Sequence, residues 1–228
     1  LKAVKAELQL HGHCQEMGLE VLSEGQVAEY VSHRLPVGAV CEPPRQKMVR
    51  LLLQRTEGNP LFLVAMVEDL LTRGVIVHTD EGWEITEEDA SIAEHIPDSI
   101  RLLVMLQSER LTPDVQQILE AASIAGMEFS VAAVAAALAT EAVTIERHCE
   151  QLAKHQRFLR RVGVEEWPDG TLAARYSFLH ALYQQLWHER VTPTQLQHYH
   201  LRIGERKERA YGERVREIAV ELAVHFEQ

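Results

Sequence analysis

The fold of this chain turns on Thr56-Glu57-Gly58-Asn59-Pro60-Leu61-Phe62-Leu63, where one helical run ends at a glycine and another begins behind a proline. Gly58 can adopt the left-handed conformation that closes the preceding helix. Asn59 can cap the next helix, and Pro60 suits its first position because no backbone amide hydrogen is needed there. The stretch therefore predicts a helix-to-helix corner, and local chemistry explains this corner without a ligand.

The regions on both sides of the corner show helical spacing of apolar residues. Ser23 and Gln26 fit a capping box, which predicts a helix from there to about residue 33. The prolines and the glycine within residues 36–44 predict a loop, after which helices should run through 48–55 and 60–72. Together these elements predict a small helical bundle.

Two short segments alternate apolar and polar residues, as strands do. Residues 19–22 predict the last strand of an α/β domain. Residues 75–77 and 83–85 flank Asp80-Glu81-Gly82 and predict a hairpin. Because Leu1 is neither an initiator methionine nor the start of a signal peptide, we expect the chain to belong to a longer protein whose α/β core precedes it.

The second half of the chain predicts helices followed by a two-stranded wing. Helices should run from Pro97 to Leu111, from Thr112-Pro113 to Gly126, and from Ser130 through an alanine-rich run. A further helix at 141–156 should bury one face, formed by Val143, Cys149, Leu152 and Ala153. This order of elements is typical of a winged helix.

The wing itself should be a hairpin of residues 158–164 and 172–178 around a turn at 167–170. One face of the return strand should point inward, and it consists of Leu172, Ala174, Tyr176 and Phe178. Helices should then occupy 180–190, 193–212 and 214–228, and the last two indicate the start of a helical-repeat array.

The expected fold is therefore mainly α, with a helical bundle, a winged-helix domain with a β-hairpin wing, and a helical region. The expected domains are the end of an α/β domain at 1–24, the helical bundle at 25–95, the winged helix at 96–190 and the helical segment at 191–228.

Four motifs carry a resemblance to a known family. They are Thr56–Leu63, Ile96–Ile100, Ala121–Gly126 and Tyr176–Leu182. In this order they resemble the STAND class of signal-transduction ATPases, which are relatives of AAA+ proteins. The similarity is greatest to large bacterial ATPases fused to adenylate or guanylate cyclase domains or to LuxR-type and other DNA-binding domains, with tetratricopeptide repeats downstream. It covers nearly the whole chain.

The resemblance identifies residues 1–24 as the remnant of a nucleotide-binding core, 25–95 as a helical lid and 191–228 as the start of a tetratricopeptide-like region. It implies a regulatory role in which lid and winged helix clamp ADP or ATP against the nucleotide-binding core. It assigns nucleotide contacts to Gly58, Asn59 and Pro60 of the lid. It also assigns the β-phosphate of ADP to a winged-helix histidine, whose counterpart by position is His180. The motif Phe178-Leu179-His180 differs from the Met-His-Asp of eukaryotic relatives. The alternative for His180 is a partly exposed capping residue at the start of the next helix. The implied cofactors are ATP or ADP, with Mg²⁺ in the full-length protein. The implied partners are the core, the downstream repeats and further copies on activation.

The chain lacks the motifs of an independent enzyme. It contains no Gly-x-x-x-x-Gly-Lys-Ser/Thr loop to cradle phosphates, so we expect neither ATP hydrolysis nor tight nucleotide binding by this chain alone. Residues 61–69 superficially resemble a Walker B strand, but they follow a helix cap and have helical spacing. The histidines lack the spacing of a zinc site, including His148 with His155 on one predicted helix face, and we predict no metal site.

Composition limits the possible partners and the compartment. The formal net charge of −11 disfavours nucleic acid as a partner, because such binding depends on Lys and Arg that neutralise phosphates. DNA binding by the winged helix is a lesser alternative, since acids dilute the basic residues of its helix at 141–156. A protein-interaction scaffold without nucleotide function is the main alternative. Three scattered cysteines and the absence of a long apolar run predict a cytoplasmic protein without a membrane partner.

Overall fold

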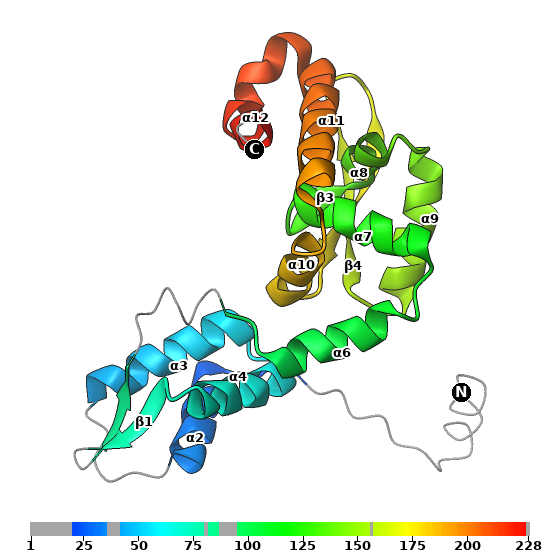
Figure 1. The fold of residues 1–228 in the computed structure, drawn as a ribbon. Coiled ribbons are helices and arrows are strands. Elements are labelled where there is room, and N and C mark those ends of the chain that lie inside the picture. The colour runs from blue at the N-terminus through cyan, green and yellow to red at the C-terminus, as the bar shows by residue number, and fades with distance from the viewer. Residues whose placement is uncertain (1–19, 36–41, 80–81, 87–94, 156, 227–228) are drawn as a thin grey trace, which may run out of the picture. The chain divides into compact units, whose positions relative to one another are not determined.

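The computed structural model describes residues 20–35, 42–79, 82–86, 95–155 and 157–226 (Figure 1). The chain divides into two compact units, Leu1–Glu94 and His95–Gln228. The described residues are mainly helical, with two small antiparallel sheets. No helix within these ranges is both long and apolar enough to cross a membrane.

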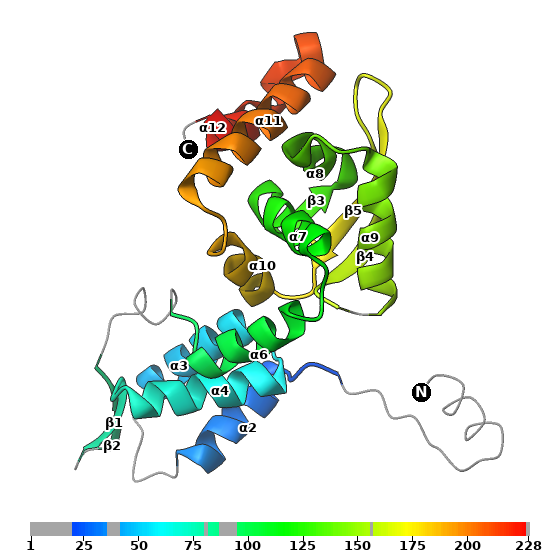
Figure 2. The same cartoon turned by 45° about the vertical axis from the view of Figure 1, so that its right-hand side comes forward.

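The first unit is a bundle of three helices, α2 (Glu24–Arg34), α3 (Glu42–Thr56) and α4 (Pro60–Thr72). The predicted capping box of α2 is confirmed: the Ser23 side chain accepts a hydrogen bond from the Gln26 amide, and the Gln26 side chain accepts one from the Ser23 amide. Figure 2 shows the three helices side by side. Their buried faces form one hydrophobic core, which includes Val27, Val31, Leu52, Leu63, Met66, Val67 and Leu70.

Two expectations for this unit are corrected. Pro43 and Pro44 lie in the first turn of α3 and not in the loop before it. A first turn tolerates proline because its amide hydrogens have no partner within the helix. Of the strand expected at 19–22, Leu19 lies outside the described residues, and Glu20 to Leu22 form no strand. Leu22 instead donates one backbone hydrogen bond, 2.8 Å long, to Gly58.

The predicted hairpin after α4 is confirmed as the antiparallel pair β1 (Ile76–Thr79) and β2 (Gly82–Ile85). Gly74, with a φ of +72°, ends the helix before it. The Thr86 amide donates to the Val75 carbonyl at 2.9 Å and extends the pairing beyond the strands. The turn residues Asp80 and Glu81 lie outside the described residues.

The second unit has the element order of a winged helix. This order is α6 (Asp98–Ser108), α7 (Pro113–Ala125), β3 (Glu128–Ser130), α8 (Val131–Leu138), α9 (Ala142–Lys154), β4 (Leu159–Glu166) and β5 (Leu172–Phe178). The sheet order is β3-β5-β4, so the predicted wing hairpin gains a third strand that the sequence analysis missed. The strand β3 pairs with Arg175 to Ser177.

Two predicted inward positions of this unit are wrong. Val143 is 77% exposed, and Ile145 instead takes its place in the core beside Cys149 and Leu152. Leu172 is 70% exposed at the start of β5. The other predicted inward residues of that strand, Ala174, Tyr176 and Phe178, are buried.

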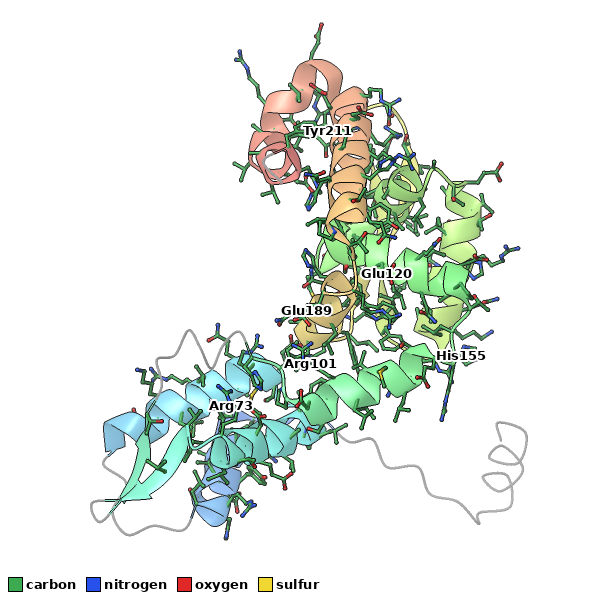
Figure 3. The ribbon with its side chains drawn as sticks, viewed as in Figure 1. Arg73, Arg101, Glu120, His155, Glu189 and Tyr211 are labelled. Carbon is green, nitrogen blue, oxygen red and sulfur yellow. The ribbon has the colours of Figure 1, made fainter. Side chains whose placement is uncertain are left out.

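The chain ends in α10 (Ala181–His188), α11 (Pro193–Tyr211), the 3₁₀ helix η1 (Gly212–Ile218) and α12 (Ala219–Phe226). The last helix was expected from Arg214 onward, but its first residues form η1 instead. Two ion pairs tie these elements together: Arg101 of α6 with Glu189, which follows α10 (Figure 3), and Lys207 of α11 with Glu221 of α12. Phe226 packs directly on Gly204, so α12 folds back against α11.

Candidate functional site

The corner between α3 and α4 has the predicted local geometry, but its glycine is held by a partner distant in sequence. Gly58 has a φ of +73°, in the left-handed region. Its carbonyl accepts the hydrogen bond from the Leu22 amide. A Cβ atom on residue 58 would lie 2.3 Å from the Leu22 carbonyl oxygen. The backbone that approaches Gly58 closely is therefore that of Leu22.

Asn59 caps α4 with its side chain. Its Oδ1 accepts hydrogen bonds from the Leu61 amide at 3.0 Å and the Phe62 amide at 3.4 Å. Its own amide donates to the Thr56 carbonyl at 2.7 Å, which continues the turn of α3 into the corner. The amides at the start of α4 are thus already occupied by the cap, and the helix start offers little to a phosphate.

Pro60 and the residues after it present an apolar surface. Pro60 is exposed, Leu61 is 55% exposed and Val64 is 37% exposed. Residues three and four apart in a helix lie on one face, so Pro60, Leu61 and Val64 adjoin one another on the surface of α4. Phe62 and Leu63 point the other way and are fully buried. This exposed apolar face is the part of the corner that packing and capping leave unexplained.

His180 is the N-cap of α10, and its side chain is only 3% exposed. Its Nδ1 accepts a hydrogen bond from the Leu182 amide at 3.0 Å. The ring also lies edge-on to Tyr183, with 6.4 Å between the ring centroids. Of the two roles considered for His180, the phosphate contact and the helix cap, the structure shows the cap. The residue is more buried than a typical surface cap. In this conformation the imidazole is not presented to a ligand.

The predicted site residues thus fall into two groups. Gly58, Asn59 and Pro60 form one corner of the first unit, and His180 belongs to the second unit. The segment 61–69, which resembles a Walker B strand in sequence, is part of α4 and therefore helical. Sequence reasoning missed Leu22 as the partner of Gly58, because no local signal connects two residues 36 positions apart.

Two acidic residues of α9, Glu146 and Glu150, contact the wing, so they do not face only solvent. Arg161 of β4 approaches Glu150 at 3.4 Å and Glu146 at 4.0 Å. The Tyr176 hydroxyl of β5 donates to Glu150 at 3.0 Å. Burial raises the pKa of Tyr176, and the Glu150 carboxylate raises it further. The helix that would read DNA in a winged helix is therefore acidic where it meets the wing.

Within the described ranges, no group of three or more His, Cys, Asp or Glu side chains is arranged to hold a metal ion. His11, His13 and Cys14 lie outside these ranges.

Comparison with known proteins leaves the function to be argued from the residues. No family model matches the sequence, and no curated protein is significantly similar to it.

Proposed function

We propose that this chain is the lid and winged-helix region of a STAND-type signal-transduction ATPase. In this proposal the first unit lays the start of α4 against a nucleotide held by a core domain. The second unit responds to whether ADP or ATP is present, and so controls assembly and output of a cytoplasmic protein. The cofactors are ADP and ATP with Mg²⁺, and the chain itself supplies contacts and no hydrolytic residue.

The observation that carries this proposal is the exposure of Pro60 and Leu61 at the start of α4. Gly58 is accounted for by Leu22 and Asn59 by its capping bonds, so neither needs a ligand. An exposed proline ring beside an exposed leucine offers an apolar surface without a competing hydrogen-bond donor, which suits the face of an adenine or a ribose. The proposal therefore places the nucleotide contact on Pro60 and assigns Gly58 and Asn59 to shaping the corner.

A pair of proline substitutions tests this contact in the protein that carries the core. Pro60→Ala should release bound ADP faster, measured by the loss of fluorescence when a labelled ADP is displaced. Pro193→Ala is the matched control, because Pro193 is also an exposed proline in the first turn of a helix behind a capping residue. Equal ADP release in the two variants and the wild type would leave Pro60 with a helix-starting role only.

His180 needs a different test, because the residue is buried and caps α10. In the proposal it contacts the β-phosphate only after a rearrangement that uncovers its ring. His180→Ser keeps a capping oxygen but is too short to reach a phosphate, whereas His180→Ala loses both functions. Faster ADP release in both variants supports a phosphate contact. Faster release in the alanine variant alone assigns His180 to capping.

A protein-interaction scaffold is the second candidate, and the outer face of α12 favours it. Val220 is 84% exposed and Val224 is 55% exposed, and the two lie four residues apart on one face of this short helix. Exposed apolar residues at helical spacing suit a contact with another helix. Nucleotide-dependent rearrangement of the full-length protein separates this candidate from the first.

A further inference from the structure

The second unit contains a surface pocket of about 380 Å³ between the start of α7 and the end of α9. This volume lies within the range of roughly 300–1,000 Å³ that small-molecule sites have. Two stretches build it: residues 110–112 with Val115, at the start of α7, and four residues near the end of α9 with Arg157 after it, namely His148, Gln151, Leu152 and His155. Figure 3 labels His155 at the C-terminal end of α9, beside this pocket.

The lining of the pocket is basic, although the chain as a whole carries a net charge of −11. Arg110 and Arg157 line it together with His148 and His155, and no Asp or Glu is among its described lining residues. Neither arginine forms an ion pair with another described residue. Several other arginines in this unit pair with carboxylates, among them Arg101, Arg161 and Arg175. Arg110 and Arg157 thus bring two guanidinium groups without a described carboxylate partner to one pocket.

Two further polar groups, the Val115 amide and the His148 ring, border the same pocket. Thr112 occupies the N-cap position of α7 but makes no side-chain capping bond, so the Val115 amide in the first turn has no partner within the helix. The Nδ1 of His148 is buried without a hydrogen-bond partner among the described residues. The Nδ1 of His155 lies 2.7 Å from the Gln151 carbonyl and donates to it, because a carbonyl only accepts, so Nε2 of the neutral ring is an acceptor and adds no donor to the pocket.

The remaining wall is apolar. Leu111, Val115 and Leu152 line it, and Leu152 is only 5% exposed. Cationic groups beside an apolar wall suit a ligand with one anionic end and one apolar end. A phosphate monoester meets both requirements, since a terminal phosphate carries a charge of about −1.5 to −2 at neutral pH and pairs with arginine in a bidentate manner.

We propose that this pocket binds the phosphate monoester of a small molecule, with Arg110 and Arg157 holding the phosphate and the apolar wall holding its organic group. The first turn of α7 adds the favourable field of a helix N-terminus. Asp114 in that turn lines the neighbouring pocket and not this one, so it does not face the phosphate directly. This site is separate from the nucleotide contact proposed for Pro60 and does not depend on it.

Titration calorimetry of the 228-residue chain with phenyl phosphate tests the site. Saturable binding at one site is expected, tighter than for inorganic phosphate, which lacks the apolar group, and absent for phenol, which lacks the phosphate. The double variant Arg110→Gln/Arg157→Gln should weaken the affinity for phenyl phosphate by about tenfold or more, because it removes charge-assisted hydrogen bonds.

The matched control is Arg147→Gln/Arg209→Gln, which removes the same charge from exposed arginines of the same unit outside the pocket lining. Its affinity for phenyl phosphate should stay near the wild-type value. Equal weakening in the two double variants, or no saturable binding to the wild-type chain, would overturn the proposal. Competition by an oligonucleotide would also overturn the proposal, if it displaced phenyl phosphate at a concentration below the one at which phenyl phosphate saturates the pocket. Such a result would indicate a nucleic-acid backbone as the ligand.

Discussion

The carbonyl oxygen of Leu22 lies 2.3 Å from the point where a Cβ atom on Gly58 would stand. The Leu22 amide also donates a 2.8 Å hydrogen bond to the Gly58 carbonyl. The segment before α2 is thereby fixed to the corner between α3 and α4. Gly58 is required both for its positive φ and for this close backbone approach.

Gly58→Ala should therefore destabilise the first unit strongly, whereas Gly74→Ala should do so only moderately. Both glycines have nearly the same φ, +73° and +72°, but nothing lies within 4 Å of a Cβ at residue 74. The left-handed conformation alone costs about 1–2 kcal/mol for an alanine. The added clash with Leu22 should bring the loss at residue 58 to about 3 kcal/mol or more. Urea unfolding followed by circular dichroism measures both, and equal losses would show that Leu22 moves away at little cost.

Cys149 should be inert towards thiol reagents while the chain is folded. The side chain is fully buried in α9, and burial together with the smaller effect of the Glu146 charge raises the pKa of its thiol to about 12. Because the thiolate is the reactive form, native Cys149 should resist iodoacetamide at pH 8 and react after denaturation. Peptide-level mass spectrometry distinguishes it from Cys14 and Cys41. Equal labelling in native and denatured protein would contradict the burial.

The sequence predicted those features that neighbouring residues determine. The capping box of Ser23 and Gln26, the Asn59 cap and the Pro60 start of α4 all depend on contacts within three residues, and all three are confirmed. The hairpin of β4 and β5 was predictable for the same reason, since alternation and a turn motif lie within one short stretch.

The missed features depend on contacts between distant residues. The three-residue strand β3 exists only because it pairs with β5, some 47 positions away. The central position of β5 also explains the error at Leu172. Neighbouring residues such as Ala173 and Ala174 are both buried, so alternation does not identify one inward face, and the strand end is left exposed. The partner of Gly58 was missed for the same physical reason.

Two buried histidines join α11 to α12. The Nδ1 atoms of His200 and His225 lie 2.8 Å apart, so one ring donates its hydrogen to the other. The pKa of His225 is lowered to about 4, mainly by burial and also by the charges of Lys207 and His200, against the opposing charge of Glu221. Burial also lowers the pKa of His200, with a contribution from His188. Both rings are therefore neutral when they pair.

This pair should make the packing of α12 on α11 sensitive to acid. In the unfolded chain a histidine has a pKa of about 6.5, so between that pH and about 4 the unfolded state binds protons that the folded pair does not. The stabilisation is complete above about pH 6.5 and is lost as the pH falls towards 4. His225→Gln removes this titration, so the difference in unfolding free energy between wild type and variant should shrink from pH 7.5 to pH 5 in urea titrations. The carboxylates titrate alike in both proteins and cancel in that difference. A difference that stays constant over this range would show that the histidines do not couple protonation to folding.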